Sequence, residues 1–312
     1  MRGGLTAQAV HVAAELGIAG ELEAGPLPVA ELAERAGVDA DALHRFLRAL
    51  AGEGAFAEEE PGIFRNTEVS ELLRPGGDWH AFAHFFGGVW YQALGESMHA
   101  VRTGDETFGR VHGEPWWTWL AARPEETLLF NRAMQGGAAT RVELFEALPW
   151  NTEVVVDIGG GNGTLLIELL KRFPALSGIV FDLPEVTAEA EARVAEAGLG
   201  ERCRVAYGSF FDGVPSGGDV YILKSILHDW DDEPAAAILS RVRAAAPAHA
   251  RLLISDAVIE PGNEPEESKW LDLLMLVLNR GRERTEPEWR ALLDRTGFRV
   301  DRIGDLIEAR CH

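Results

Sequence analysis

The chain has 312 residues, 46% of them hydrophobic and 25% charged, which is enough for two domains with a substantial core. Asp and Glu number 50 against 29 for Lys and Arg, and the formal net charge is −21. A surface of this sign repels nucleic-acid backbones and anionic membranes, so we expect neither as a partner.

The two cysteines, Cys203 and Cys311, lie far apart and in no metal-ligand spacing, which predicts reduced thiols in a cytoplasmic protein. Near the N-terminus the apolar residues are interrupted by Gln8, His11 and Glu15. That pattern predicts an amphipathic helix rather than a signal peptide. No stretch approaches the roughly 20 uninterrupted apolar residues that a membrane span needs.

The first region, residues 1–75, has the outline of a winged helix. Two helical patterns and then two short alternating segments follow one another at 29–37, 39–54, 55–57 and 63–66. Asp39 or Asp41 is placed to cap the second helix. A winged helix can bind DNA, here through His44, Arg45 and Arg48, or can serve packing and dimerisation. Acidic neighbours make this a poor phosphate-binding face, so we expect a dimerisation domain.

The second region, residues 76–150, is rich in aromatic residues at helical spacing. We predict a helical linker that contributes to the substrate site, to a dimer interface, or to both, because rings pack well on flat aromatic molecules and on one another. The rings belong to Trp79, Phe82, Phe85, Phe86, Trp90, Tyr91, Trp116, Trp117 and Trp119.

The third region, residues 151–312, alternates fully apolar runs with helical patterns, which predicts an α/β fold with a mostly parallel sheet covered on both faces. Two final runs, 298–303 and 306–311, are too close together for a helical crossover. They predict an antiparallel hairpin at or near the edge of the sheet.

Each predicted parallel strand ends on a polar residue, and the carboxyl ends of such strands meet at one edge, where these sheets bind ligands. Five polar ends in succession therefore predict a site. The residues are Asp157, Asp182, Ser209, Lys224 with His228 just beyond it, and Asp256.

The first strand leads into "DIGGGNGT", a glycine loop between a strand and a helix that lets a ligand approach the backbone. Asp182, at the end of the next strand, is placed to accept both hydroxyls of a ribose. Together they predict a nucleoside cofactor. A dinucleotide fingerprint would have Gly or Ala where this chain has Thr164, although an NAD enzyme could carry the same acid.

The stretch "YILKSILHDWDDEP", residues 221–234, begins as a strand and ends as a helix start. Asp231 or Asp232 could be the N-cap, with Pro234 in the first turn. Helix capping explains neither Lys224 nor His228, which predicts a functional role for both.

The segments "VVVDIGGGNGTLL", "FDLPEV", "GSFFDGVP", "ILKSILHDWDDE" and "GRERTEPEW" resemble, in order and spacing, the S-adenosylmethionine-dependent O-methyltransferases of the caffeate and polyketide type. The resemblance spans nearly all of the chain. It implies a class I methyltransferase Rossmann-like sheet behind a winged-helix dimerisation domain. It also implies a homodimer, S-adenosylmethionine as cofactor, and an aromatic hydroxyl as acceptor.

The resemblance implies residue roles as well. The cofactor would be bound by Gly159, Gly161, Asp182, Leu183, Gly208, Ser209, Phe210 and Lys224. His228 would be the general base, with Asp256 and Glu283 on either side of its ring. The acceptor pocket would be lined by Met134, Met275 and Asn279. The division would be 1–75 for dimerisation, 76–150 for the helical linker and 151–312 for catalysis.

The chemistry suits these residues. A phenol with a pKa of about 10 is mostly protonated at neutral pH, and a neutral imidazole can take its proton. A carboxylate on the other ring nitrogen fixes the tautomer and stabilises the imidazolium. With a histidine base and no cluster of Asp and Asn ligands, we expect no metal.

Some positions depart from the family pattern and leave alternatives open. Ser209 stands where relatives usually have Asp, and Arg280 where they often have Pro. Thr285 and Glu288 give Glu283 a second interpretation, as part of a charged loop before a helix. Asp256 could instead bond to backbone. Rival functions are a cofactor-binding relative that catalyses hydroxylation, decarboxylation or rearrangement, a DNA-binding regulator, and an NAD oxidoreductase.

Overall fold

The computed structural model describes residues 2–139 and 142–312. They form two compact units. The first contains the chain up to Glu96 together with Thr118–Gly137, and the second contains Ser97–Trp117 and Ala138–His312. The helical stretch that we predicted as one linker, 76–150, is therefore shared between both units.

The first unit contains the expected winged helix. Helices α3 (Val29–Ala36) and α4 (Ala40–Gly52) are followed by the hairpin of β2 (Phe56–Glu60) and β3 (Ile63–Asn66), to which β1 (Leu27–Pro28) adds a short strand. Asp39 is the N-cap of α4 and accepts a hydrogen bond from the Ala42 amide at 2.8 Å. The other helices of this unit are α1 (Gly3–Glu15), α2 (Ile18–Glu21), α5 (Glu68–Glu71), α6 (Asp78–Gly87), α7 (Val89–Gly95) and α11 (Pro124–Ala139), whose last two residues belong to the second unit.

The aromatic residues of the first unit divide between core and surface. Phe85 is fully buried and stacks on Trp90, with ring centroids 5.2 Å apart. Trp79 and Phe86, in contrast, are 58% and 40% exposed. Helical spacing alone could not separate these two groups.

The second unit is built on a sheet whose described strands follow the order β11-β12-β8-β7-β4-β5-β6. The five strands β4 to β8 pair in parallel, in the order β8-β7-β4-β5-β6, while β12 runs antiparallel to both β8 and β11. This arrangement confirms the predicted fold class and its antiparallel C-terminal hairpin. The bounds are β4 (Val154–Ile158), β5 (Ser177–Asp182), β6 (Cys203–Tyr207), β7 (Val220–Lys224), β8 (Arg251–Ser255), β11 (Phe298–Arg302) and β12 (Ile307–Cys311).

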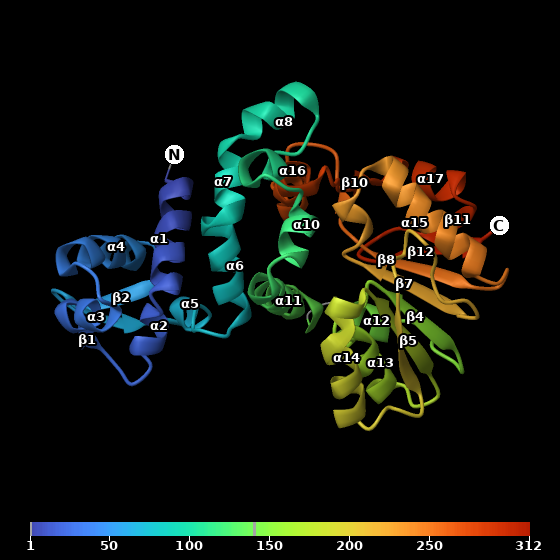
Figure 1. Cartoon of the computed structure of the whole chain (residues 1–312), viewed down its shortest axis with the longest axis horizontal. Helices are drawn as coiled ribbons and strands as arrows, with labels where there is room; N and C mark the ends of the chain where they lie inside the picture. The colour runs from blue at the N-terminus through green and yellow to red at the C-terminus, as the bar shows by residue number, and fades with distance from the viewer. Residues whose placement is uncertain (1, 140–141) are drawn as a thin grey trace. The chain divides into compact units, whose positions relative to one another are not determined.

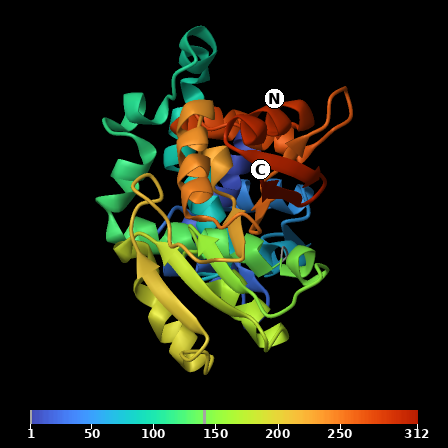
Figure 2. The same ribbon diagram turned by 90° about the vertical axis from the view of Figure 1, so that its right-hand side faces the viewer.

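Helices cover both faces of this sheet (Figures 1 and 2). Neighbouring residues of a strand point to opposite faces, so Val155 packs with α12 (Val142–Glu146), α13 (Thr164–Arg172) and α14 (Pro184–Glu196). Val156 packs with the other layer, α15 (Asp232–Ala245) and α17 (Glu286–Arg295). The strands are apolar on both faces because each face is buried.

Shorter elements lie beyond the carboxyl ends of the strands. A 3₁₀ turn, η1 (Leu227–Asp229), follows β7, and β9 (Val258–Ile259) pairs in parallel with β10 (Arg284–Thr285). The second unit also has α8 (Ser97–Thr103), α9 (Phe108–His112) and α16 (Glu267–Asn279), while α10 (Trp116–Ala121) crosses the division between units. In the described residues, no helix combines the length and apolar character required to cross a membrane.

Candidate active site

The glycine loop after β4 contacts the end of β5. Gly159 and Gly161 have φ of +69° and +58°, which favours glycine at both positions. A Cβ at Gly159 would also lie 2.2 Å from Ile226 Cδ1. The amide of Gly161 donates to Asp182 Oδ2 at 2.9 Å. The loop is therefore joined to the acid that we expected to bind a ribose.

Asp182 is held by amides on both of its oxygens. Besides the Gly161 amide, the Leu183 amide donates to Oδ1 at 2.7 Å. Burial raises the pKa of Asp182 above its ordinary value, although both hydrogen bonds act in the opposite direction. The Leu183 side chain next to it is 41% exposed. The carboxylate is thus fixed in place beside an accessible apolar side chain.

Asp157 lies in the same edge, near the end of β4. It is only 2% exposed, and its Oδ2 has no hydrogen-bond partner. Burial raises the pKa of Asp157 to about 7, while the positive charge of Lys224 lowers it and the charge of Asp182 raises it. The edge therefore holds a buried carboxylate group that a bound cation would stabilise.

Gly208, Ser209 and Phe210 follow β6 at this edge. The Gly208 amide donates to the Asp182 carbonyl at 3.1 Å, and Ser209 Oγ accepts from the Phe211 amide at 3.2 Å. The Phe210 ring lies edge-on to Trp230, with centroids 6.1 Å apart. The side chain of Ser209, which stands where relatives usually have Asp, thus forms a hydrogen bond within its own loop.

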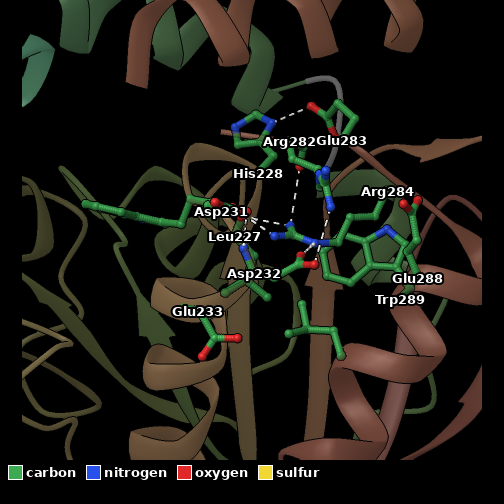
Figure 3. A network of polar contacts seen from close by, with 12 residues as sticks. Leu227, His228, Asp231, Asp232, Glu233, Arg282, Glu283, Arg284, Glu288 and Trp289 are labelled. Carbon is green, nitrogen blue, oxygen red and sulfur yellow. Dashed lines mark hydrogen bonds and ion pairs between the residues drawn. The ribbon is translucent and has the colours of Figure 1, made fainter. Parts of the chain in front are cut away.

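His228 lies in η1, and its ring is paired with Glu283 (Figure 3). Its Nδ1 is 2.6 Å from Glu283 Oε1. Since the carboxylate accepts, Nδ1 carries a proton and Nε2 is the basic nitrogen of the neutral ring. Glu283 is 2% exposed, and its Oε2 is buried without a hydrogen-bond partner. Only the family resemblance predicted that these two residues lie together.

Asp256, which we expected beside the ring, contacts the backbone of the turn that carries His228. Its Oδ2 accepts from the amides of Leu227 and His228, at 3.1 and 3.2 Å. The reason is local, because Asp256 directly follows β8 and meets the first amides of the turn after the neighbouring strand. The backbone interpretation left open by the sequence therefore describes its contacts.

The carboxylate on the other side of the ring is Asp229, to which the sequence analysis gave no role at the site. Its Oδ1 is 3.8 Å from His228 Nε2 and accepts from Asn279 Nδ2 at 3.3 Å. The cap of α15 is Asp231, whose side chain accepts from the Asp232 amide. Direct adjacency to His228 was the one sequence signal that could have identified Asp229.

These charges control the protonation of the ring. Burial lowers the pKa of His228, but the charge of Asp229, the hydrogen bond to Glu283 and the charges of Asp256 and Glu283 outweigh it and raise the pKa to about 10. Burial also raises the pKa of Asp229 to about 7, against the opposing effect of His228. The carboxylates around the ring therefore favour its protonated form and make it a stronger base than a free imidazole.

The three predicted acceptor-pocket residues have different surroundings. Met134 lies on α11 in the first unit and is 36% exposed. In the second unit, Met275 is a buried residue of α16, and Asn279 ends that helix. Besides donating to Asp229, Asn279 accepts from the Gly281 amide at 3.0 Å. Arg280, in the left-handed conformation with φ of +60°, pairs with Asp105 at 3.1 Å.

A mostly parallel Rossmann-like sheet that ends in an antiparallel hairpin, with a glycine loop joined to an acid, has the features of a class I methyltransferase. The imidazole–carboxylate pair beside it adds a candidate base. The family model of the O-methyltransferase domain matches residues 91–299, and that of the O-methyltransferase dimerisation domain matches residues 1–75. The chain belongs to this O-methyltransferase family, and it is an S-adenosylmethionine-dependent O-methyltransferase.

Individual relatives agree with the family. The phenazine O-methyltransferase PhzM of Lysobacter antibioticus is 42% identical over 95% of this chain and 88% of its own length. The mitomycin biosynthesis 6-O-methyltransferase of Streptomyces lavendulae is 37% identical over 97% and 88%. The solved O-methyltransferase NcsB1, in complex with S-adenosylmethionine and 2-hydroxy-5-methyl naphthoic acid, has a TM-score of 0.87, 34% identity and coverage of 98% and 96%. These matches do not favour the rival functions.

The residues at the strand ends fit the cofactor. The backbone at Gly161 is open to close approach, since a Cβ there would meet nothing within 4 Å, and Asp182 presents a fixed carboxylate to hydroxyls. The partnerless buried oxygen of Asp157 suits the positive charge of S-adenosylmethionine. All of these groups belong to the second unit.

Proposed function

We propose that the enzyme methylates a hydroxyl of an aromatic, polyketide-like small molecule, with His228 as general base. The observation that carries this proposal is the 2.6 Å contact between His228 Nδ1 and Glu283 Oε1 at the edge of the sheet. The names of the relatives support the acceptor class, since they include phenazine and mitomycin O-methyltransferases.

The cofactor would be held by Gly159, Gly161, Asp182 and Leu183, with Gly208, Ser209, Phe210 and Lys224 completing its site. When bound, it supplies a methyl group activated on a sulfonium. Met134, Met275 and Asn279 would contribute to acceptor binding. Support comes from the fixed Asp182 carboxylate and the positive φ values of the two loop glycines.

The chain's own contribution is proton transfer and orientation. His228 Nε2 accepts the proton of the acceptor hydroxyl, and the oxygen thereby gains the negative charge that nucleophilic attack requires. Glu283 keeps Nδ1 protonated and stabilises the resulting imidazolium. The charge of Asp229, whose Oδ1 lies 3.8 Å from Nε2, raises the pKa of the ring and thereby strengthens it as a base.

We also propose a homodimer formed through the first unit. Support comes from the dimerisation-domain match over residues 1–75 and from Leu5, which is 75% exposed on α1. Another face of α1 contributes to a cavity of roughly 440 Å³, which is lined by Arg2, Gly3, Thr6, Ala7, Val10, Glu53, Ala83 and Phe86. Leu5→Asp should convert the dimer to a monomer in light scattering without changing the far-ultraviolet circular dichroism.

The division into 1–75, 76–150 and 151–312 and a cytoplasmic location remain part of the proposal. The free thiols of Cys203 and Cys311 support a reducing compartment. Limited proteolysis would test the boundaries, since cleavage is expected near residues 75 and 150 before it occurs within the sheet.

The decisive experiment compares wild type with His228→Gln. Thermal unfolding is measured with S-adenosylmethionine and with S-adenosylhomocysteine, and turnover with 2-hydroxy-5-methyl naphthoic acid and a panel of other phenols. We expect both proteins to be stabilised by the cofactor, by about 2.7 kcal/mol at a hundred times the dissociation constant. Turnover by the variant should fall about 10²- to 10⁴-fold. Undiminished turnover by His228→Gln would exclude the base, and no stabilisation of wild type would exclude the cofactor site.

A further inference from the structure

Arg284 is a fully buried arginine one residue after Glu283, and the proposed reaction has no direct use for it. Its guanidinium lies 5.2 Å from the ring centroid of Trp289, and Nε donates to Asp232 Oδ1 at 3.0 Å. Its other contacts are with backbone carbonyls, to which Nη1 and Nη2 donate (Figure 3). A buried guanidinium needs several such partners to offset the loss of water.

The carbonyls that it contacts lie on both sides of His228. Nη1 donates to the Leu227 carbonyl at 3.0 Å, and Nη2 donates to the Trp230 carbonyl at 2.8 Å. Leu227 is the first residue of the turn that carries the base, and Trp230 directly follows its last residue. A single planar group therefore fixes the spacing between the two ends of this turn.

The rest of the turn is held by neighbouring groups. Asp256 binds the amides of Leu227 and His228, and the Arg282 amide donates to the His228 carbonyl at 2.7 Å. Arg284 Nη1 also donates to the Arg282 carbonyl at 3.3 Å. The segment that holds the His228 turn is thus the same segment that carries Glu283.

We propose that Arg284 is a positioning residue that sets the contact between His228 and Glu283. By joining the His228 turn to the segment Arg282–Arg284, it holds the ring nitrogen and the carboxylate at hydrogen-bonding distance. This inference rests on the proposed function of His228 as the base. Lysine would keep the charge but lacks the planar fork that reaches Asp232 and two carbonyls together.

Arg284→Lys tests this role, and Arg282→Lys is its matched control. Arg282 pairs with the other oxygen of the same carboxylate, Asp232 Oδ2, at 3.3 Å, but its side chain is 45% exposed. We expect Arg284→Lys to reduce kcat about 10- to 100-fold while KM for S-adenosylmethionine changes less than twofold, because misplacement of a catalytic group by about 1 Å has an effect of that size. Arg282→Lys should remain within twofold of wild type.

The second measurement does not depend on activity. The ring of His228 is titrated by nuclear magnetic resonance in the protein without ligands, with His228→Gln used to assign its signals. We expect Arg284→Lys to lower the pKa of His228, because the ring loses its close contact with Glu283, and we expect Arg282→Lys to leave it unchanged. An unchanged His228 pKa in folded Arg284→Lys would overturn the inference, whatever the outcome for the base itself.

A double-mutant cycle with Glu283→Gln separates positioning from a general effect on folding. If Arg284 acts through Glu283, Arg284→Lys should reduce kcat less than threefold in the Glu283→Gln background. Equal effects in both backgrounds would contradict the inference. Should Arg284→Lys not fold, Asp232→Asn leaves the carbonyl contacts in place and should lower the His228 pKa in the same direction; no change in that variant would also contradict it.

Discussion

The two acidic parts of the site are built in different ways. Asp182 accepts hydrogen bonds from amides that are 21 and 1 positions away in the sequence, at the ends of adjacent parallel strands. Glu283 reaches His228 from 55 positions away, through a segment that pairs with the separate short strand β9. The first arrangement is fixed by local backbone, whereas the second depends on long-range contacts among side chains. Substitutions should therefore separate cofactor binding from proton transfer.

The largest expected effect is on proton transfer. In Glu283→Gln the ring loses the charge that holds Nδ1–H and stabilises the imidazolium, so kcat should fall about 10²- to 10³-fold. Cofactor affinity, measured by calorimetry with S-adenosylhomocysteine, should stay within about threefold. An equal loss of affinity and turnover would show that the two parts of the site are not separable.

The converse substitution should act on binding. Asp182→Asn should remove the equivalent of one charge-assisted hydrogen bond to the cofactor, about 1.5–3 kcal/mol, so the dissociation constant of S-adenosylhomocysteine should rise roughly 10- to 150-fold. At saturating cofactor, kcat should stay close to that of wild type. A matched control is Glu185→Gln, a nearby acidic residue in the first turn of α14 with no side-chain hydrogen bond described.

A smaller effect is expected at Asp229, whose charge raises the pKa of His228. In Asp229→Asn that pKa should fall, and the rising limb of kcat/KM against pH should move to lower pH. A profile that does not move, or moves to higher pH, would show that Asp229 does not control the base. Asp231→Asn, at the exposed cap of α15, is the control.

The smallest expected effect is on stability. The pKa of His228 is raised from 6.5 to about 10, so its contribution to stability is fully present below about pH 6.5 and is lost as the pH rises through 10. The difference in unfolding free energy between wild type and His228→Gln should thus shrink by on the order of 1 kcal/mol or more between pH 6 and pH 10.5. Denaturant titrations at the two pH values would measure it.

The same contrast between local and long-range contacts explains what could be predicted from the sequence. Apolar runs predicted strands such as β5 within a residue, since a fully buried strand leaves a direct pattern in the sequence. Asp39 and Asp231 were recognisable as caps because capping involves adjacent residues. The glycine loop and Asp182 follow from strand ends that must meet at one edge.

The contacts of His228 were harder to predict from the sequence. The sequence predicted Asp256 beside His228 but not Asp229, because the side chain that lies near Nε2 depends on how η1 turns after β7. Arg284 looked like one more charge in "RERTEPEW", because its burial depends on Asp232 and two carbonyls distant in sequence. Thr285 and Glu288 form the expected capping box. The segment is therefore a helix start, as its charged pattern suggested, and it also carries Glu283 to His228.

The position of β12 has a consequence for the order in which the enzyme can be made. This strand is synthesised after β11 but lies between β11 and β8. While residues 256–306 are being translated, β8 presents an unpaired edge, and unpaired edges of apolar strands are prone to pair with other chains. The edge of β8 therefore stays open until residues 307–311 have been synthesised. During this interval a chaperone would protect the chain from pairing with other chains.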